Sequence, residues 1–284
     1  MLFVTMDSAC SLPSPYTDTE PPHISCHIAT GEEVKGCGQL CDSGFWASAT
    51  VDDVQAELDS GANTKKTNAH GYSPLHLAAR CAGDPELIAV LLEAGADANR
   101  KGPMDVTPLH VAGGFADGAI LELLIDAGAK LEAKSWRRDY TPLHFAAWGD
   151  NPEGARVLLE SGALPNPRAG LDRTPLVVAL IEQASLATVT ALLDFGASVR
   201  WDGSDRNALH IAAIHDARPE IIYLLVSRGA DVNARNAFDE TPLMTAFRYR
   251  SSKWTRQALA EARINPDGYV DSRNHEGKTW LHRA

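Results

Sequence analysis

The sequence predicts an all-α solenoid, in which helix–turn–helix repeats stack side by side and hairpin-like fingers project from one edge. Two observations predict this fold class. A tetrad of the type Thr-Pro-Leu-His recurs at intervals of 34, 34, 33, 33, 34 and 38 residues, and a Gly-Ala pair recurs at intervals of 34, 33, 34, 34 and 33. Because two different motifs keep one period, they indicate a single structural unit repeated along most of the chain.

The tetrad is suited to starting a short helix. In the copy at residues 141–144, the Thr141 hydroxyl can cap the helix and Pro142 fits the first helical position, where no N–H is needed. One such helix cannot bury its apolar face alone, so it needs neighbours. The copies begin at Ser73, Thr107, Thr141, Thr174, Asn207, Thr241 and Thr279.

A second helix with a broader apolar face follows each tetrad, as in residues 86–93. Gly95 comes directly after it, where a left-handed residue ends a helix at little cost. Residues 96–99 then start a finger that leads to the next tetrad. The same plan predicts second helices at 120–126, 155–160, 187–194 and 221–227.

From Phe45 to the C-terminus the chain resembles the ankyrin repeat family, whose signature T-P-L-H-x-A is matched by residues 141–146. The resemblance implies that the recurring histidines are hydrogen-bonding struts between neighbouring repeats and not metal ligands. Val177 and Met244 replace the histidine in two repeats without a substitute ligand. The histidines concerned are His76, His110, His144 and His210.

The predicted domains are an acidic arm at residues 1–44 and a repeat domain at residues 45–284. The arm has no helical or strand period and carries six acidic residues against one lysine, a net charge of −5, so it is expected to be disordered or loosely ordered. Its cysteines and histidines leave three alternatives open: free thiols, a disulfide, or a zinc site. The residues concerned are Cys10, His23, Cys26, His27, Cys37 and Cys41, and the expected disulfide is Cys37–Cys41 or Cys26–Cys37.

The repeat domain is predicted to hold about seven repeats, of which the first and last are atypical. Phe45 and Trp46 are expected to cover the open N-terminal end. The copy at Thr279 lacks a second helix, so the last repeats are expected to be the least stable. Residues 41–50 resemble the start of bacterial ankyrin proteins, which predicts a bacterial-type member of the family.

Composition narrows the classes of partner. The net charge is −11, which disfavours nucleic acid and anionic membrane. The first residues lack a basic region and no apolar run is long enough to span a bilayer, so a cytoplasmic location is expected. A start site that hides a signal peptide would make the protein periplasmic or exported.

No phosphate-binding loop, nucleophile elbow or metal-binding helix motif is present in the sequence, so we expect no enzyme, no cofactor and no metal. The resemblance implies a monomeric scaffold that meets protein partners at its finger tips and on its first helices. Arginines and aromatics at those positions predict a site for an acidic or extended segment; the competing interpretation is a set of ordinary surface side chains. The predicted site residues are Trp136, Arg137, Arg138, Tyr140, Trp148, Arg173, Arg206, His215, Arg248 and Tyr249.

Two other functions remain open. One is an inhibitor or immunity-type protein that blocks an enzyme with a finger, suggested by Trp136 and Trp201. The other is a metal- or redox-responsive adaptor that senses through the Cys/His arm. The acidic arm is also a candidate to occupy the predicted basic site, in which case deleting it is expected to raise partner affinity.

Overall fold

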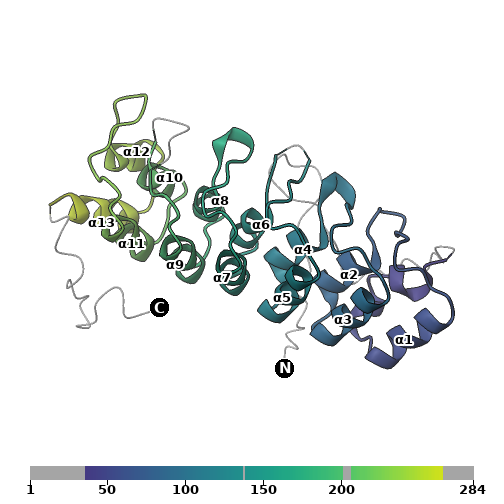
Figure 1. The fold of residues 1–284 in the computed structure, drawn as a ribbon. Helices are drawn as coiled ribbons and strands as arrows, with labels where there is room; N and C mark the ends of the chain where they lie inside the picture. Colours follow the sequence, from purple (N-terminus) through teal and green to yellow (C-terminus); the bar gives the residue numbers. More distant parts are fainter. Residues whose placement is uncertain (1–35, 137, 201–205, 265–284) are drawn as a thin grey trace, which may run out of the picture.

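The computed structural model describes residues 36–136, 138–200 and 206–264. Figure 1 shows a curved stack of helix pairs in two layers, with loops projecting beyond the layer of first helices. Within the described ranges the regular elements are helices. Two isolated β-bridges pair Ala169 with Arg173 and Arg200 with Asn207. The predicted all-α solenoid is confirmed. None of the described helices is both long enough and apolar enough to cross a membrane.

Each repeat from α2 onward contributes one helix to each layer, and the first repeat contributes only α1. The first-helix layer consists of α2 (Pro74–Cys81), α4 (Pro108–Phe115), α6 (Pro142–Trp148), α8 (Pro175–Ile181), α10 (Ala208–Ile214) and α12 (Pro242–Arg248). The second-helix layer consists of α1 (Val51–Asp59), α3 (Pro85–Glu93), α5 (Gly118–Asp126), α7 (Pro152–Glu160), α9 (Leu186–Asp194), α11 (Pro219–Ser227) and α13 (Lys253–Ile264). Short 3-10 turns are η1 (Gly38–Cys41), η2 (Phe45–Ala47), η3 (Pro103–Asp105) and η4 (Gly170–Asp172).

The tetrads start the first helices as the sequence predicts. Thr141 has an extended backbone at the N-cap, and Pro142 takes the first helical position. The glycines of the Gly-Ala pairs follow the second helices with positive φ, as at Gly95 with φ 81°. These local signals set both ends of a helix pair, and packing against the neighbouring pairs buries the apolar faces of Leu109, Leu143 and their equivalents.

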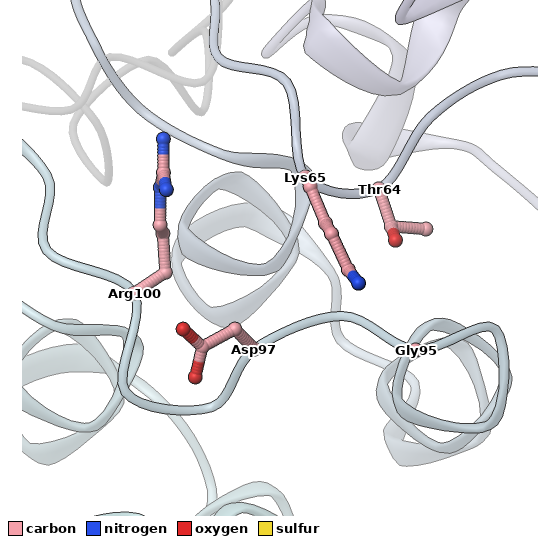
Figure 2. A pocket seen from close by; sticks show the side chains of 5 residues that line it. All are labelled: Thr64, Lys65, Gly95, Asp97 and Arg100. Carbon is pink, nitrogen blue, oxygen red and sulfur yellow. The ribbon is translucent and has the colours of Figure 1, made fainter.

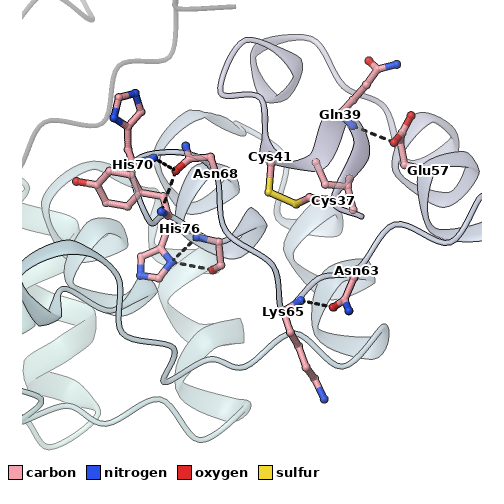
Figure 3. Close-up of a disulfide and its surroundings, with 12 residues drawn as sticks. Cys37, Gln39, Cys41, Glu57, Asn63, Lys65, Asn68, His70 and His76 are labelled. Carbon is pink, nitrogen blue, oxygen red and sulfur yellow. Dashed lines mark hydrogen bonds between the residues drawn. A yellow bond between two sulfur atoms is a disulfide. The ribbon is translucent and has the colours of Figure 1, made fainter. Parts of the chain in front are cut away.

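Residues 36–44 belong to the predicted arm at residues 1–44, and the structure describes this last part of it. Residues 36–44 are packed onto the first repeat, because η1 buries Leu40 between the two cysteines Cys37 and Cys41. These cysteines form a disulfide, one of the two pairings expected (Figure 3). Trp46 is buried as predicted, and its indole Nε1–H donates to the Leu40 carbonyl oxygen at 3.1 Å. The end of the solenoid is therefore closed by η1 and η2 together.

At the other end the described residues end with α13. The predicted tetrad at Thr279 and the rest of the arm before residue 36 lie outside the described residues. Within the described part, α12 presents Met244 and Phe247 to solvent.

Candidate functional site

The recurring histidines are struts. Nδ1 of His144 accepts the backbone N–H of Thr141 at 3.1 Å, and its Nε2–H donates to the carbonyl oxygen of Arg173 in the next repeat at 3.0 Å. The same pair of bonds recurs at His76, His110 and His210. Burial lowers the pKa of His76, His110 and His144 to about 4. The predicted strut role is confirmed.

These histidines are unsuited to metal binding, because both ring nitrogens are already engaged. Among the described residues no group of three or more His, Cys, Asp or Glu side chains is placed to hold a metal ion. The zinc alternative would therefore have to rest on residues of the arm that lie outside the described ranges.

A row of large side chains lies where the first helices end, and we call Arg80, Phe115 and Trp148 the helix-end row. The guanidinium of Arg80 lies 4.0 Å from the centroid of the Phe115 ring. Phe115 in turn meets Trp148 edge-to-face, with centroids 5.5 Å apart. Both aromatic rings are half-buried. The row therefore runs across α2, α4 and α6 and keeps part of each ring open to solvent.

Tyr140, which the sequence placed at the centre of the binding site, is a packing residue. It is only 5% exposed, and its ring stacks on His144 with centroids 4.9 Å apart. Arg173 Nη1 donates to the Tyr140 hydroxyl at 3.4 Å, and the Arg138 guanidinium lies 6.0 Å from the ring centroid. Arg173 thus contacts the preceding finger through the Tyr140 hydroxyl, while Arg138 lies beside the same ring within its own finger; both arginines are half-buried.

The other predicted residues are spread along the solenoid. Arg248 is exposed, pairs with Glu240 at 2.9 Å and lies 4.9 Å from the Phe238 ring centroid. His215 and Arg206 are half-buried, and burial followed by the charge of Arg173 lowers the pKa of His215. Tyr249 and Trp136 are exposed, and Arg137 lies outside the described residues. The structure brings Trp148 into a row with Arg80 and Phe115 but leaves Arg248 and Tyr249 at the far end.

The finger tips carry exposed apolar side chains that the predicted site leaves out. Each is flanked by an oppositely charged pair: Lys101–Asp105 at 3.1 Å beside Met104, Arg168–Asp172 at 3.9 Å beside Leu171, and Arg235–Asp239 at 2.7 Å beside Phe238. A sequence signal exists, since each of these apolar residues precedes an aspartate two positions before a tetrad. Its meaning depends on the backbone conformation of the finger.

A hollow of about 300 Å³ lies between the loops that follow α1 and α3 (Figure 2). Its lining is mainly polar and includes two basic side chains and one acidic side chain: Thr64, Lys65, Gly95, Asp97 and Arg100. The carboxylate of Asp97 already accepts the backbone N–H of Asn99 at 2.8 Å. The hollow lacks the apolar walls that enclose a small-molecule ligand.

Comparisons with known sequences agree with this geometry. A family model described as ankyrin repeats (3 copies) matches residues 75–169 and 165–236. Inversin from Canis lupus familiaris is 31% identical over 128 residues, 45% of this chain and 11% of that protein. A putative ankyrin repeat protein R664 from Acanthamoeba polyphaga mimivirus is 34% identical over 73 residues, 24% of this chain and 45% of that protein. The chain thus spans about a tenth of inversin.

Solved structures are similar over most of the chain. The human ASB11 ankyrin repeat domain has a TM-score of 0.66 and 28% identity, covering 77% of this chain and 96% of that one. The ankyrin repeat domain of Bcl-3, a member of the IkappaB family, has a TM-score of 0.58 and 29% identity, covering 73% and 90%. The sequence relatives named here are mammalian and viral, so the bacterial-type assignment stays a prediction. Because the family model matches more than half of the chain, the protein belongs to the ankyrin repeat family.

Proposed function

We propose that the protein is a non-enzymatic scaffold that binds a protein partner on its first-helix layer and fingers. Ankyrin repeat domains are generally protein–protein interaction modules, and the similar domains of Bcl-3 and ASB11 share this fold. The observation that carries the proposal is the helix-end row. Aromatic and arginine side chains dominate interface energetics because they bury large areas and offer directed donors.

The proposed partner is an acidic or extended segment bound to a monomeric, cofactor-free scaffold. Support for an acidic partner comes from Arg138 and Arg173, whose guanidinium groups lie beside Tyr140 between two fingers. Part of the predicted basic charge is already neutralised within the chain, since Arg248 pairs with Glu240. The row around Trp148 is therefore the centre of the proposed site, and Arg206, His215, Arg248 and Tyr249 form its periphery.

A double variant tests the proposal. Once a partner has been captured with the intact chain and identified, Trp148→Ala combined with Arg138→Glu is expected to weaken its binding at least about tenfold, because an aromatic anchor and a favourable charge are both lost. Trp254→Ala is the matched control, since Trp254 is exposed on α13 away from the row. Unchanged binding of the double variant by calorimetry would overturn the proposal.

The Cys37–Cys41 disulfide favours a redox-responsive adaptor as a second candidate. The disulfide closes η1, which buries Leu40 at the end of the solenoid, and Cys81 is disulfide-bonded as well. Disulfides persist mainly in oxidising compartments, so the disulfide favours the exported location over the cytoplasmic one. Thiol counting on protein isolated without reductant tests it: free thiols at Cys37 and Cys41 would remove its basis.

A further inference from the structure

Cys81 is the last residue of α2, and it is disulfide-bonded. The chain has five cysteines, and Cys37 is bonded to Cys41. The partner of Cys81 within the chain is therefore Cys10 or Cys26. Both belong to the part of the acidic arm that lies outside the described residues. The bond thus joins that part of the arm to the end of α2.

The attachment point lies at one end of the helix-end row. Cys81 directly follows Arg80, whose guanidinium lies 4.0 Å from the centroid of the Phe115 ring. Phe115 continues the row to Trp148, and both of these rings are half-buried. Cys81 itself packs against the hydrophobic core from its edge. A segment that is bonded to Cys81 therefore starts directly beside the row.

The outer arm, which we define as residues 1–35, is long enough for this connection. It joins the described chain at Gly36, immediately before η1, and η1 contacts α2. The eight residues of α2 make a helix about 12 Å long. Even the nearer cysteine, Cys26, is ten residues from Gly36, and ten residues span up to roughly 33–36 Å. Either cysteine can thus reach the end of α2.

Charge divides the two layers of the solenoid (Figure 1). The second helices α1, α3 and α5, together with Asp84 and Asp117 before the last two, carry ten acidic side chains and no basic one. The first helices α2, α4 and α6, with the fingers that lead into them, carry eight basic and four acidic side chains among the described residues. The basic ones are Lys65, Lys66, Arg80, Arg100, Lys101, Lys130, Lys134 and Arg138, and the acidic ones are Asp97, Asp105, Glu132 and Asp139.

The outer arm has the charge that fits the basic layer. It carries five acidic residues and one lysine, a net charge of −4. The second-helix layer repels such a segment, while the fingers and first helices attract it. Because the disulfide keeps the segment at an effective concentration in the millimolar range, even a weak contact is largely occupied. Charge and attachment therefore select the same side of the solenoid.

We propose that the outer arm is an intramolecular cover of the helix-end row and the basic fingers beside it, held in place by the disulfide of Cys81. The cover competes with any partner that binds at the row, and this consequence rests on the proposed scaffold function. The covering itself needs no partner. The cover and the partner site can therefore be tested separately.

Peptide mapping identifies the bond. The full chain is isolated without reductant, its free thiols are blocked, and the digest is analysed by mass spectrometry. A peptide with Cys81 joined to a peptide with Cys10 or Cys26 is expected. A free thiol at Cys81, or a bond between two copies of the chain, would overturn the tether.

Hydroxyl-radical labelling read by mass spectrometry measures whether the row is covered. Cys81→Ser in the full chain is expected to raise the labelling of Phe115 and Trp148 at least about twofold, because loss of the tether lowers the local concentration of the outer arm. Cys10→Ser combined with Cys26→Ser breaks the same bond without altering α2, and the same rise is expected. Unchanged labelling of the row in both variants would overturn the cover.

Cys37→Ser combined with Cys41→Ser is the matched control, since it removes a disulfide but keeps the tether. It is expected to leave the labelling of the row unchanged. Trp254, which is exposed on α13, is an internal reference whose labelling is expected to stay constant in all variants. A rise at the row as large as that in Cys81→Ser would mean that any lost disulfide loosens the solenoid, and it would overturn the cover.

Neutralising the outer arm tests the charge argument. The combined variant keeps the disulfide and is expected to raise the labelling of the row toward the level of Cys81→Ser, because the attraction to the basic fingers is lost. Labelling that stays at the level of the parent protein would overturn the charge-based docking. The substitutions are Asp18→Asn, Glu20→Gln, Glu32→Gln and Glu33→Gln.

A natural partner, once captured with the intact chain and identified, separates the cover from the scaffold function. Cys81→Ser is expected to bind it about fivefold more tightly, because the row is open in a larger fraction of the molecules. If labelling of the row rises but affinity does not, the cover stands and the partner site on the row falls. If Trp148→Ala combined with Arg138→Glu weakens binding while Cys81→Ser changes neither labelling nor affinity, the scaffold function stands and the cover falls.

Discussion

At the scale of single residues, each capping histidine can make both of its ring-nitrogen hydrogen bonds to the backbone only as one neutral tautomer. A backbone N–H can only donate, so Nδ1 of His110 must accept from Thr107 at 3.1 Å. A carbonyl oxygen can only accept, so Nε2 must carry the hydrogen that is donated to Tyr140 at 2.9 Å. Protonation of Nδ1 would break the first bond and place a charge in a dry site.

The pH dependence of stability follows from these pKa values. Burial lowers the pKa of His76, His110 and His144 to about 4, while the unfolded chain titrates near its usual value of about 6.5. The unfolded state therefore binds more protons between these values. The stabilisation is complete above about pH 6.5 and is lost as the pH falls toward about 4, by up to about 1.4 kcal/mol per pH unit for each histidine. Urea unfolding at a series of pH values measures this slope.

His110→Val, which copies the natural Val177, isolates one histidine. It is expected to lower stability at neutral pH, because the Tyr140 carbonyl oxygen loses its donor, and to reduce the slope by up to one proton. Leu109→Ala is the control, since it destabilises the same helix without removing a titrating group. A slope that is identical in His110→Val and the parent protein would contradict the assignment.

Asp150 is a second residue with a specific role between repeats. Its carboxylate accepts the backbone N–H of Ser185 at 2.8 Å, the Ser185 hydroxyl at 2.7 Å and the buried Thr188 hydroxyl. Asp216 repeats the arrangement with Ser252 and Thr255. Both aspartates have positive φ. The carboxylate thus caps a second helix that belongs to the following repeat.

Asp150→Gly is expected to destabilise the protein by about 2–3 kcal/mol, because a buried hydroxyl and a helix N-terminus lose a charged acceptor. Glycine is chosen because it adopts the positive φ of this position without strain, so any loss of stability comes from the missing carboxylate. Asp239→Gly is the control: Asp239 also has positive φ of 59°, but its side chain is exposed and pairs only at the surface with Arg235. Equal denaturation midpoints for the two variants would refute the capping role.

At the scale of elements, glycines decide how closely α4 and α6 approach. A Cβ on Gly149 would lie 2.1 Å from the carbonyl oxygen of Gly114, and a Cβ on Gly113 would lie 2.7 Å from that of Pro142. The obstacle is backbone in both cases, so no side-chain rotation can relieve it. Gly149 has φ −78°, so its requirement for glycine is purely steric.

Gly149→Ala is therefore expected to cost at least about 1–3 kcal/mol, because α4 and α6 must separate. Gly83→Ala provides the comparison, since a Cβ there meets no atom within 4 Å and φ is not in the left-handed region. That change is expected to be neutral or to stabilise by up to about 1 kcal/mol. Thermal unfolding compares the two variants. A midpoint for Gly149→Ala as high as that for Gly83→Ala would contradict the steric argument.

The helix pairs could be predicted because their signals are local: a cap and a proline at Thr141 and Pro142, and a glycine after the second helix. The site could be predicted only in part. Tyr140 stacks on the nearby His144, but its contact with Arg173 joins residues far apart in the sequence, and spacing does not reveal it. Met104 and Leu171 carry their information in a left-handed backbone that their residue types do not suggest. Residues 36–44 gave no periodic signal because η1 is a single short turn.

At the scale of the whole molecule, stability in a solenoid is a sum of repeats and the interfaces between them. The central repeats have an interface on each side. The N-terminal end is closed by η1, η2 and the buried Trp46. In the described part of the C-terminal end, Met244 is 52% exposed although the equivalent histidines are fully buried. Phe247 is 60% exposed, where Ala79, Ala147 and Ala213 are at most 1% exposed.

We therefore expect local unfolding to begin at α12 and α13, because α12 buries less apolar surface than the equivalent central helices. Amide hydrogen exchange followed by mass spectrometry is expected to show faster exchange in α12 and α13 than in α4 to α9, with the lowest opening free energy at that end.

Phe247→Ala is expected to change global stability by less than about 1 kcal/mol, since little of the ring is buried there. Leu143→Ala, in the fully enclosed core of α6, is expected to cost about 2–5 kcal/mol. Equal exchange along the solenoid, or a large cost for Phe247→Ala, would instead mean that this surface is covered in solution, either by the remainder of the chain or by a second molecule.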